Sequence, residues 1–161
     1  MEHPKDVGDR ITLAVTLALR DAGFAISVPF GENTRYDLVI DDGVRLLRAQ
    51  RKTGRLRNGS IFFATCSTYG HHLRPGQARR VYTGQIDSFC VYCTETRGVY
   101  LIPLAHVPTR SSAALPVERS LNGQRKRVRV ASDYQVGAIE VAEVGVTPEP
   151  RASSGAQGSS A

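Results

Sequence analysis

The sequence lacks several features that would place it in a special class of protein. It has no Trp and one Met among its 161 residues, and its three Cys are too few, and odd in number, for a disulfide framework. No run approaches the roughly 18 apolar residues of a membrane span. The N-terminal MEHPKDVGDR has neither the basic start nor the apolar stretch of a secretory signal. We therefore expect a cytoplasmic protein with free thiols.

The cysteines raise the question of a zinc site. Cys90 and Cys93 have CxxC spacing, but they lie in SFCVYC, which is typical of a strand. Residues three apart on a strand point to opposite faces, so these two thiols are not expected to bind one ion. Cys66, Cys90 and Cys93 are better interpreted as buried thiols.

Positive charge is in excess. The chain has 21 Lys and Arg against 15 Asp and Glu, which gives a formal net charge of +6 at pH 7. A basic balance suits a polyanionic partner such as nucleic acid. Solubility alone also accounts for such a charge, so composition leaves both interpretations open.

The length suits one domain with a substantial core. We expect a folded domain over residues 1–137 and a disordered tail over 138–161, because the last part, TPEPRASSGAQGSSA, has no large apolar residue. Hydrophobic periodicity predicts a helix over 6–22 and strands over 24–28, 36–40, 44–52, 61–67, 88–93 and 98–104. Residues 125–131 are either a last strand or the edge between a strand and a helix. This order predicts an α/β domain with one central mixed sheet.

Two of these apolar runs meet at Asp42-Gly43, a strong signal for a two-residue hairpin turn. Such a turn pairs Asp37 with Arg48. It predicts a core face of Tyr36, Leu38, Ile40, Leu47 and Ala49, and a polar face of Arg35, Asp37, Arg48, Gln50 and Lys52.

The polar face carries groups suited to chemistry. Asp37 and Gln50 lie on a diagonal across the hairpin, and carboxylate and amide oxygens are hard ligands that suit Mg²⁺. Lys52, beside Gln50, is suited to orienting an attacking water or stabilising charge on a phosphate. The alternative is a solvated sheet face with scattered polar residues.

A longer series of motifs resembles a known family. Gly8-Asp9 opens the first helix, and then follow PFGENTRYDLV, LLRAQRKTG, NGSIFFATCSTY, VYTGQIDSFCVYC, VYLIPL and NGQRKRVRVASDY. Together, over roughly residues 5–135, these are similar to the PD-(D/E)xK nucleases, in the branch that includes the cyanobacterial group I intron homing endonuclease.

The resemblance implies a restriction-endonuclease-like core, a central mixed sheet with flanking helices, and hydrolysis of double-stranded DNA with Mg²⁺, for which Mn²⁺ can substitute. It implies Asp37 as the metal-binding acid, Gln50 as a carbonyl ligand in place of the usual acid, and Lys52 as the catalytic lysine. Such nucleases often act as homo-oligomers, because cutting two strands needs two sites. No membrane partner is expected.

One position departs from this branch. Its first helix usually carries a Glu in a pattern like G-D-x-x-E, where this chain has Thr12. Without that acid, affinity for Mg²⁺ should suffer. Asp9 lies one helical turn before Thr12 and could substitute in part as a metal ligand.

Several polar residues are candidates for contacting DNA, although solvated loops account for each one equally well. Clusters of cations should bind phosphates if they form one basic wall. The candidates are Arg55, Arg57, Ser67, Arg79, Arg80, Arg125 and Lys126. Asp87, before an apolar strand, is expected to bond backbone amides instead of metal.

Two alternative functions stay open. One is a DNA-binding module whose catalytic site lapsed with Thr12. The other is a nuclease for junctions or repair that recognises the shape of DNA instead of a sequence.

Overall fold

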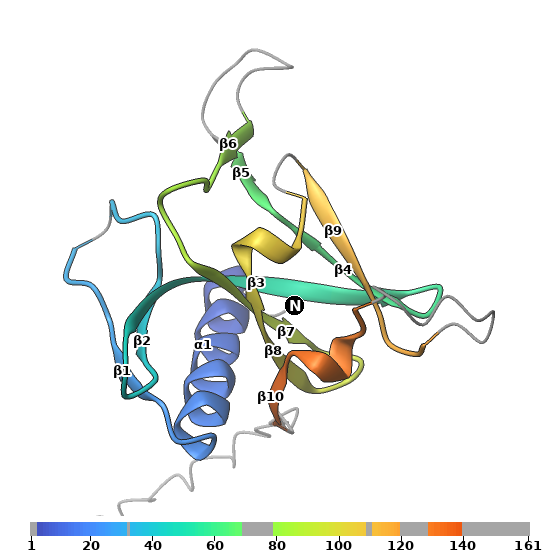
Figure 1. The fold of residues 1–161 in the computed structure, drawn as a ribbon, viewed down its shortest axis with the longest axis horizontal. Helices are drawn as coiled ribbons and strands as arrows, with labels where there is room; N and C mark the ends of the chain where they lie inside the picture. Colours follow the sequence, from blue (N-terminus) through green and yellow to red (C-terminus); the bar gives the residue numbers. More distant parts are fainter. Residues whose placement is uncertain (1–2, 32, 69–78, 109–110, 120–128, 140–161) are drawn as a thin grey trace, which may run out of the picture.

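The computed structural model describes residues 3–31, 33–68, 79–108, 111–119 and 129–139. Within these ranges lie one α-helix, two short 3-10 helices and ten strands (Figure 1). In chain order they are α1 (Pro4–Asp21), β1 (Ala25–Ser27), β2 (Leu38–Asp41), β3 (Leu46–Arg57), β4 (Ser60–Ala64), β5 (Cys66–Thr68), β6 (Arg79–Val81), β7 (Ser88–Cys93), β8 (Gly98–Pro103), η1 (Leu104–His106), β9 (Ser112–Pro116), η2 (Ala131–Asp133) and β10 (Gln135–Ala138).

The central sheet has the strand order β1-β2-β3-β7-β8-β10. β3 and β7 are parallel, whereas the other neighbours along this path are antiparallel. The predicted central mixed sheet is therefore confirmed. β4 pairs with the far half of β3, and β9 pairs with β4, while β5 and β6 form a separate two-stranded ribbon.

α1 covers one face of this sheet (Figure 1). Its buried stripe, Ile11, Ala14, Val15, Ala18 and Leu19, packs against Leu38, Ile40 and Ala49 of the hairpin and against β7. Val7, near the N-terminal end of the helix, is 37% exposed and is not part of this stripe. The helix begins with Pro in its first turn and is followed by Gly23 with a positive φ of 93°, a conformation that favours glycine.

A second core lies on the opposite face of the sheet. There β4 and β9 fold back over β7 and β8, so that Ile61, Phe63 and Leu115 pack against Phe89 and Ile102. Cys90 belongs to the core under α1 and Cys93 to this second core. The prediction that the two thiols face opposite ways is thus confirmed, and all three cysteines are free and buried.

Gly54 lies where β3 passes from β7 to β4. A Cβ at this position would lie 2.7 Å from Ile61 Cγ2 and 2.9 Å from Val91 Cγ1. Only glycine allows β4 to approach β7 so closely, and this approach curls the sheet around the second core.

The predicted two-residue turn of the hairpin is wrong. Leu46 pairs with Asp41, and Arg48 pairs with Val39, so the loop contains four residues, 42–45. The Asp42 side chain stabilises this longer loop by accepting hydrogen bonds from the backbone N–H groups of Val44 and Arg45. The register differs by two residues, and strand side chains alternate with a period of two, so each strand keeps its faces.

Tyr36 is an exception to the predicted faces. It lies before β2 begins and packs against the second core, not against the core under α1. The alternation that holds within a strand does not extend into the segment that leads to it.

The predicted strand over 61–67 is two strands, β4 and β5, which separate at buried Thr65 and belong to different sheets. β6 and β9 arise where loops were expected. The last described strand is β10. Residues 129–131 of the segment 125–131 are not in a strand, and the 3-10 helix η2 begins at Ala131. Ala138 in β10 and core-packed Ile139 were both assigned to the tail, whose remainder lies outside the described residues.

Among the described residues, no helix combines the length and the apolar character that a membrane crossing requires.

Candidate functional site

Asp37 and Gln50 are in direct contact. The Gln50 side-chain N–H donates to Asp37 Oδ2 over 2.8 Å. Asp37 lies just before β2 and Gln50 in β3, and the backbone N–H of Asp37 donates to the Ala49 carbonyl over 2.9 Å. The longer loop places Asp37 directly opposite Gln50, so their side chains lie closer together than in the diagonal arrangement that the two-residue turn predicts. Both are half-buried.

The backbone of Arg51 fixes the same carboxylate. Its N–H donates to Asp37 Oδ2 over 2.9 Å, and its guanidinium donates to the Gly8 carbonyl in the first turns of α1 over 3.1 Å. The Thr12 hydroxyl donates to that same carbonyl over 2.8 Å. The Arg51 guanidinium of β3 therefore bonds the N-terminal part of α1, whereas the Thr12 hydroxyl bonds only its own helix in the described structure. Asp9 is exposed.

Lys52 projects from the same face of β3 as Gln50, two residues further on. Its ammonium donates to the Cys66 carbonyl over 3.1 Å and to the Tyr82 hydroxyl over 3.2 Å. Within the described part of the chain it has no hydrogen bond or ion pair with Asp37 or Gln50. The structure thus pairs two of the three predicted residues directly and places the third beside them.

Arg35 and Tyr82 adjoin this site, and sequence reasoning did not assign either a role there. The Arg35 guanidinium lies 4.2 Å from the centre of the Tyr82 ring, and it donates to the Ser67 hydroxyl over 2.8 Å. Further bonds reach Gln85 and, over 3.0 Å, the Val81 carbonyl. Arg35 was signalled only by its place on the polar face of the hairpin, and nothing in the local sequence signals Tyr82.

Asp87 bonds the backbone, as predicted. It accepts from the Arg48 N–H over 2.7 Å and forms an ion pair with the Arg48 guanidinium at 3.3 Å. Hydrogen bonding to Arg48 is the main cause that lowers the pKa of Asp87, and it outweighs the opposing effect of burial. Asp87 therefore joins β3 to the start of β7.

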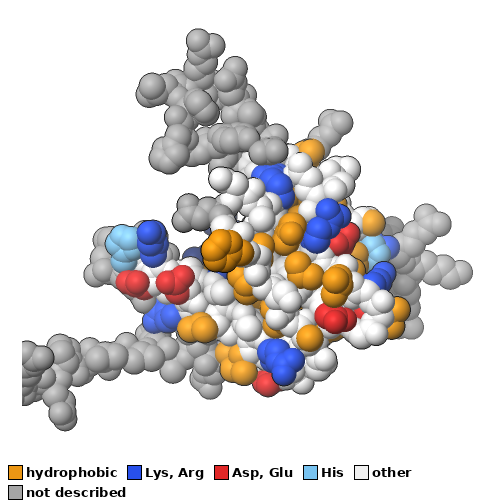
Figure 2. All heavy atoms as spheres, turned by 90° about the vertical axis from the view of Figure 1, so that its left-hand side faces the viewer, with side chains coloured by type: hydrophobic (Ala, Val, Ile, Leu, Met, Phe, Trp, Pro, Cys, Tyr) orange, Lys and Arg blue, Asp and Glu red, His pale blue; other side chains and the backbone are white. Residues whose placement is uncertain are grey.

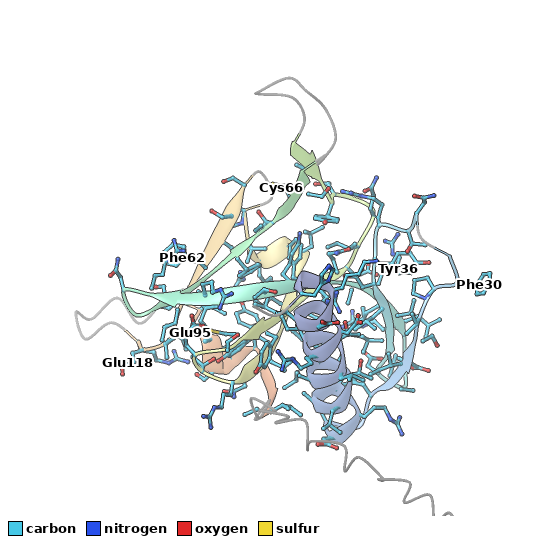
Figure 3. All side chains as sticks on the ribbon, turned by 180° about the vertical axis from the view of Figure 1, so that it is seen from behind. Phe30, Tyr36, Phe62, Cys66, Glu95 and Glu118 are labelled. Atoms are coloured by element: carbon cyan, nitrogen blue, oxygen red, sulfur yellow. The ribbon has the colours of Figure 1, made fainter. Side chains whose placement is uncertain are left out.

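The arginines beyond Lys52 lie on the other side of β3. Side chains two residues apart on a strand share a face, so Arg55 and Arg57 lie on the same face of β3 as Arg51, which bonds α1. Lys52, which bonds Tyr82, lies on the opposite face. Arg55 is 4.0 Å from Glu95. Figure 3 shows Glu95 and Phe62 near the far end of β3, away from Tyr36 and Cys66. These two arginines do not join Asp37 on one face.

The remaining DNA-contact candidates are only partly placed. Arg79 and Arg80 lie in β6. Arg125 and Lys126 lie outside the described residues. Among the side chains coloured in Figure 2, Lys and Arg are separated by apolar and acidic groups and form no continuous basic wall on that face.

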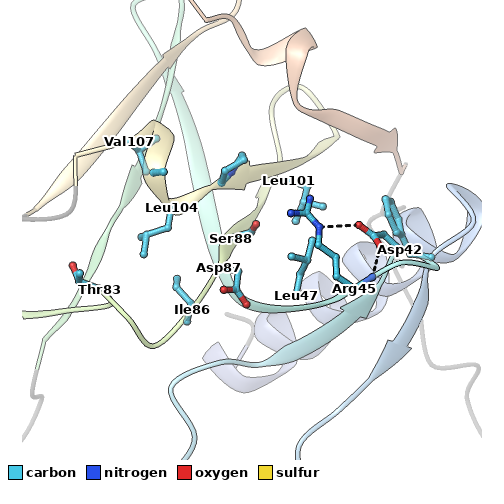
Figure 4. Close-up of a pocket in the computed structure, with 13 residues that line it drawn as sticks. Asp42, Arg45, Leu47, Thr83, Ile86, Asp87, Ser88, Leu101, Leu104 and Val107 are labelled. Carbon is cyan, nitrogen blue, oxygen red and sulfur yellow. Dashed lines mark hydrogen bonds and ion pairs between the residues drawn. The ribbon is translucent and has the colours of Figure 1, made fainter.

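A hollow of about 910 Å³ lies elsewhere, between the loop 42–45 and η1 (Figure 4). Its walls are mainly apolar and include Leu47, Leu101 and Leu104, and the Asp42–Arg45 ion pair lies at its edge. It contains none of Asp37, Gln50 and Lys52. The candidate site is therefore not this hollow.

The donor set at Asp37 suits one hard cation, held weakly. Asp37 provides carboxylate oxygens, and Gln50 can present its Oε1 if the amide turns over, since its nitrogen now faces Asp37. The described residues contain no group of three or more His, Cys, Asp or Glu side chains arranged to hold an ion. Any metal here would rely on substrate oxygens and water for its other ligands.

The curled mixed sheet, with an acid before β2 and Gln-x-Lys in β3, defines a nuclease-type core. A family model described as PD-(D/E)XK endonuclease matches residues 2–137. The chain belongs to this family of endonucleases, as the resemblance predicted.

Among solved structures, a bacterial homing endonuclease, I-Ssp6803I, is similar in fold. Its TM-score is 0.60 and its sequence identity 21%, over 83% of this chain and 89% of that chain. No match was found among curated proteins.

Proposed function

We propose that this protein is a metal-dependent endonuclease that hydrolyses phosphodiester bonds in double-stranded DNA. The observation that carries the proposal is the contact between Asp37 and Gln50, with Lys52 beside them on one face of β3, in a chain of the PD-(D/E)XK endonuclease family. Members of this family generally use divalent metal ions.

Asp37 and Gln50 would hold the ion, with Mg²⁺ favoured and Mn²⁺ as a substitute, because both offer oxygen ligands. When bound, the ion would neutralise phosphate charge and make an attacking water more acidic. Asp37 is prepared for this role because the Arg51 N–H fixes its orientation. A carboxylate held in this way loses little side-chain entropy on binding a cation.

Lys52 would act on the phosphate. An ammonium has three N–H donors, and Cys66 and Tyr82 use two of them. No third acceptor lies among the described residues, so one N–H can bond a phosphate oxygen, where negative charge increases during attack. A point charge aimed at that oxygen stabilises the transition state more than the ground state.

A second candidate function, a DNA-binding module without catalysis, is favoured by two contacts at the Gly8 carbonyl of α1. The Thr12 hydroxyl is bonded to its own helix, and Arg51 brings a positive charge to the same carbonyl. Position 12 therefore supplies no negative charge near Asp37, and Arg51 supplies a positive one, so affinity for a cation is lower than with a Glu at position 12.

Nicking of supercoiled plasmid with Mg²⁺ or Mn²⁺ separates the two functions. We expect the wild type to nick the plasmid and EDTA to stop it, and we expect Asp37→Asn and Lys52→Ala to bind DNA without nicking it. Asp41→Asn is the matched control, because Asp41 lies at the other end of β2 and its side chain bonds only the local backbone of Gly43 in the described structure.

Metal-independent binding with no nicking by the wild type at any metal concentration would establish the non-catalytic module. Comparing four-way junctions with linear duplex would then show whether the substrate is defined by shape. Cytoplasmic location and homo-oligomer formation stay predictions of the sequence.

A further inference from the structure

We propose that Tyr82 is a positioning residue for the reaction: its hydroxyl, together with the Cys66 carbonyl, holds the Lys52 ammonium in one orientation and directs its remaining N–H towards the scissile phosphate. This inference rests on the proposed function, since Lys52 acts on substrate only if the protein is a nuclease.

The contact between Lys52 and Tyr82 is a hydrogen bond to the hydroxyl. The ammonium lies 3.2 Å from the hydroxyl oxygen and 4.9 Å from the centre of the ring. The ammonium therefore bonds the hydroxyl and also lies over the ring within cation–π distance, and only the first of these contacts needs the hydroxyl. Two acceptors from different segments, the Tyr82 hydroxyl and the Cys66 carbonyl, restrict a side chain that has four rotatable bonds.

The Tyr82 ring is itself fixed on several sides. It is 3% exposed and packs edge-on against Phe89, with ring centres 5.6 Å apart and planes at 86°. Arg35 covers it at 4.2 Å. The Tyr82 carbonyl accepts backbone hydrogen bonds from Gln85 at 2.9 Å and Ile86 at 3.3 Å. A hydroxyl on so constrained a ring occupies one position and can define the position of Lys52.

Arg35 connects this support to the other half of the site. It lies two residues before Asp37 and bonds Ser67 in β5 and the carbonyl of Val81 at the end of β6. The segment leading to Asp37 and the segment that carries Tyr82 are thus joined by one guanidinium. Arg35 and Tyr82 therefore fix the position of Asp37 relative to that of Lys52.

The test is Tyr82→Phe, which removes the hydroxyl and keeps the buried ring. Tyr100→Phe is the matched control, because Tyr100 is also 3% exposed and its hydroxyl bonds Thr96 in the β7–β8 turn. Single-turnover nicking at saturating enzyme gives the rate constant, and binding in Ca²⁺ gives the Kd for the same DNA. We expect Tyr82→Phe to reduce the rate constant about tenfold with an unchanged Kd, as for loss of one hydrogen bond to a charged group.

NMR of the lysine ammonium groups supplies a readout without catalysis. We expect the Lys52 signal, assigned by its loss in Lys52→Arg, to exchange faster with water in Tyr82→Phe and to be unchanged in Tyr100→Phe. Equal nicking rates and equal ammonium exchange in wild type and Tyr82→Phe would overturn the inference and leave the nuclease assignment intact. A wild type that never nicks DNA would overturn both.

Discussion

The side-chain amide of Gln50 donates to the carboxylate of Asp37 over 2.8 Å, so the position where the family usually has a second acid is occupied by a hydrogen-bond donor to the first. Each of two carboxylates at this distance would disfavour ionisation of the other unless a cation lay between them. The neutral Gln50 amide avoids this repulsion when no metal is bound. It also offers a bound metal one negative charge fewer than a carboxylate would.

Gln50→Glu tests this balance. Without metal, repulsion from Asp37 and loss of the hydrogen bond should destabilise the fold by about 1 kcal/mol, a fall in Tm of about 2–4 °C. Mg²⁺ should raise the Tm of this variant more than that of wild type. Thermal unfolding in EDTA and in Mg²⁺ measures both, with Gln135→Glu at an exposed position of β10 as control. An equal response of variant and wild type to Mg²⁺ would count against a metal between these residues.

Thr12→Glu should strengthen metal binding. The Thr12 hydroxyl and the Arg51 guanidinium both donate to the Gly8 carbonyl, and the Arg51 backbone N–H donates to Asp37. An acid at position 12 therefore adds negative charge close to the site. We expect the Mg²⁺ concentration for half-maximal nicking to fall about tenfold, which corresponds to about 1.4 kcal/mol.

Thr16→Glu is the control for this change. Thr16 makes the same bond to the helix backbone, to the Thr12 carbonyl at 2.7 Å, but lies one turn further from Gly8. Equal Mg²⁺ requirements for the two Glu variants would show that position 12 has no special access to the metal.

Asp87→Asn should destabilise the protein in a pH-dependent way. Bonds to Arg48 lower the pKa of Asp87 in the folded state, so the carboxylate contributes stability above its unfolded pKa near 4 and loses it as pH falls through the folded pKa. Because the ion pair is partly exposed, the cost at pH 7 should be about 1 kcal/mol or less. Urea unfolding from pH 7 to pH 2.5 should show the difference from wild type shrinking below about pH 4. A difference that stays constant with pH would exclude this ionic contribution.

Gly54→Ala should destabilise the curl of the sheet. The added methyl would press on Ile61 and Val91 in a closely packed core, at a cost of about 1–3 kcal/mol. Gly8→Ala is the control, since no atom lies within 4 Å of its added Cβ and alanine favours a helix. Urea unfolding compares the two. Equal free energies of unfolding for Gly54→Ala and wild type would mean that β4 can move away from β7 without loss of stability.

The apolar and polar alternation along the chain was sufficient to predict which side chains of β2 and β3 face the core, but not the length of the turn between them. Leu38, Ile40 and Ala49 are buried on one face as predicted, because alternation along a strand is a property of the strand alone, and the structure shows that α1 covers this face. The turn was wrong because the side chain of Asp42 bonds the loop backbone, and the Asp-Gly signal does not distinguish a loop of two residues from one of four.

The sequence by itself determined that Asp37, Gln50 and Lys52 belong to one polar face, and its motifs were enough to identify the family. The tertiary structure alone decided what those groups touch. Tyr82, 30 residues from Lys52, reaches the ammonium from a different segment of the chain, and Phe89 and Arg35 pack against its ring. Strand alternation is set by neighbouring residues along the chain, whereas contacts between distant segments depend on how the cores pack, and no local pattern encodes that packing.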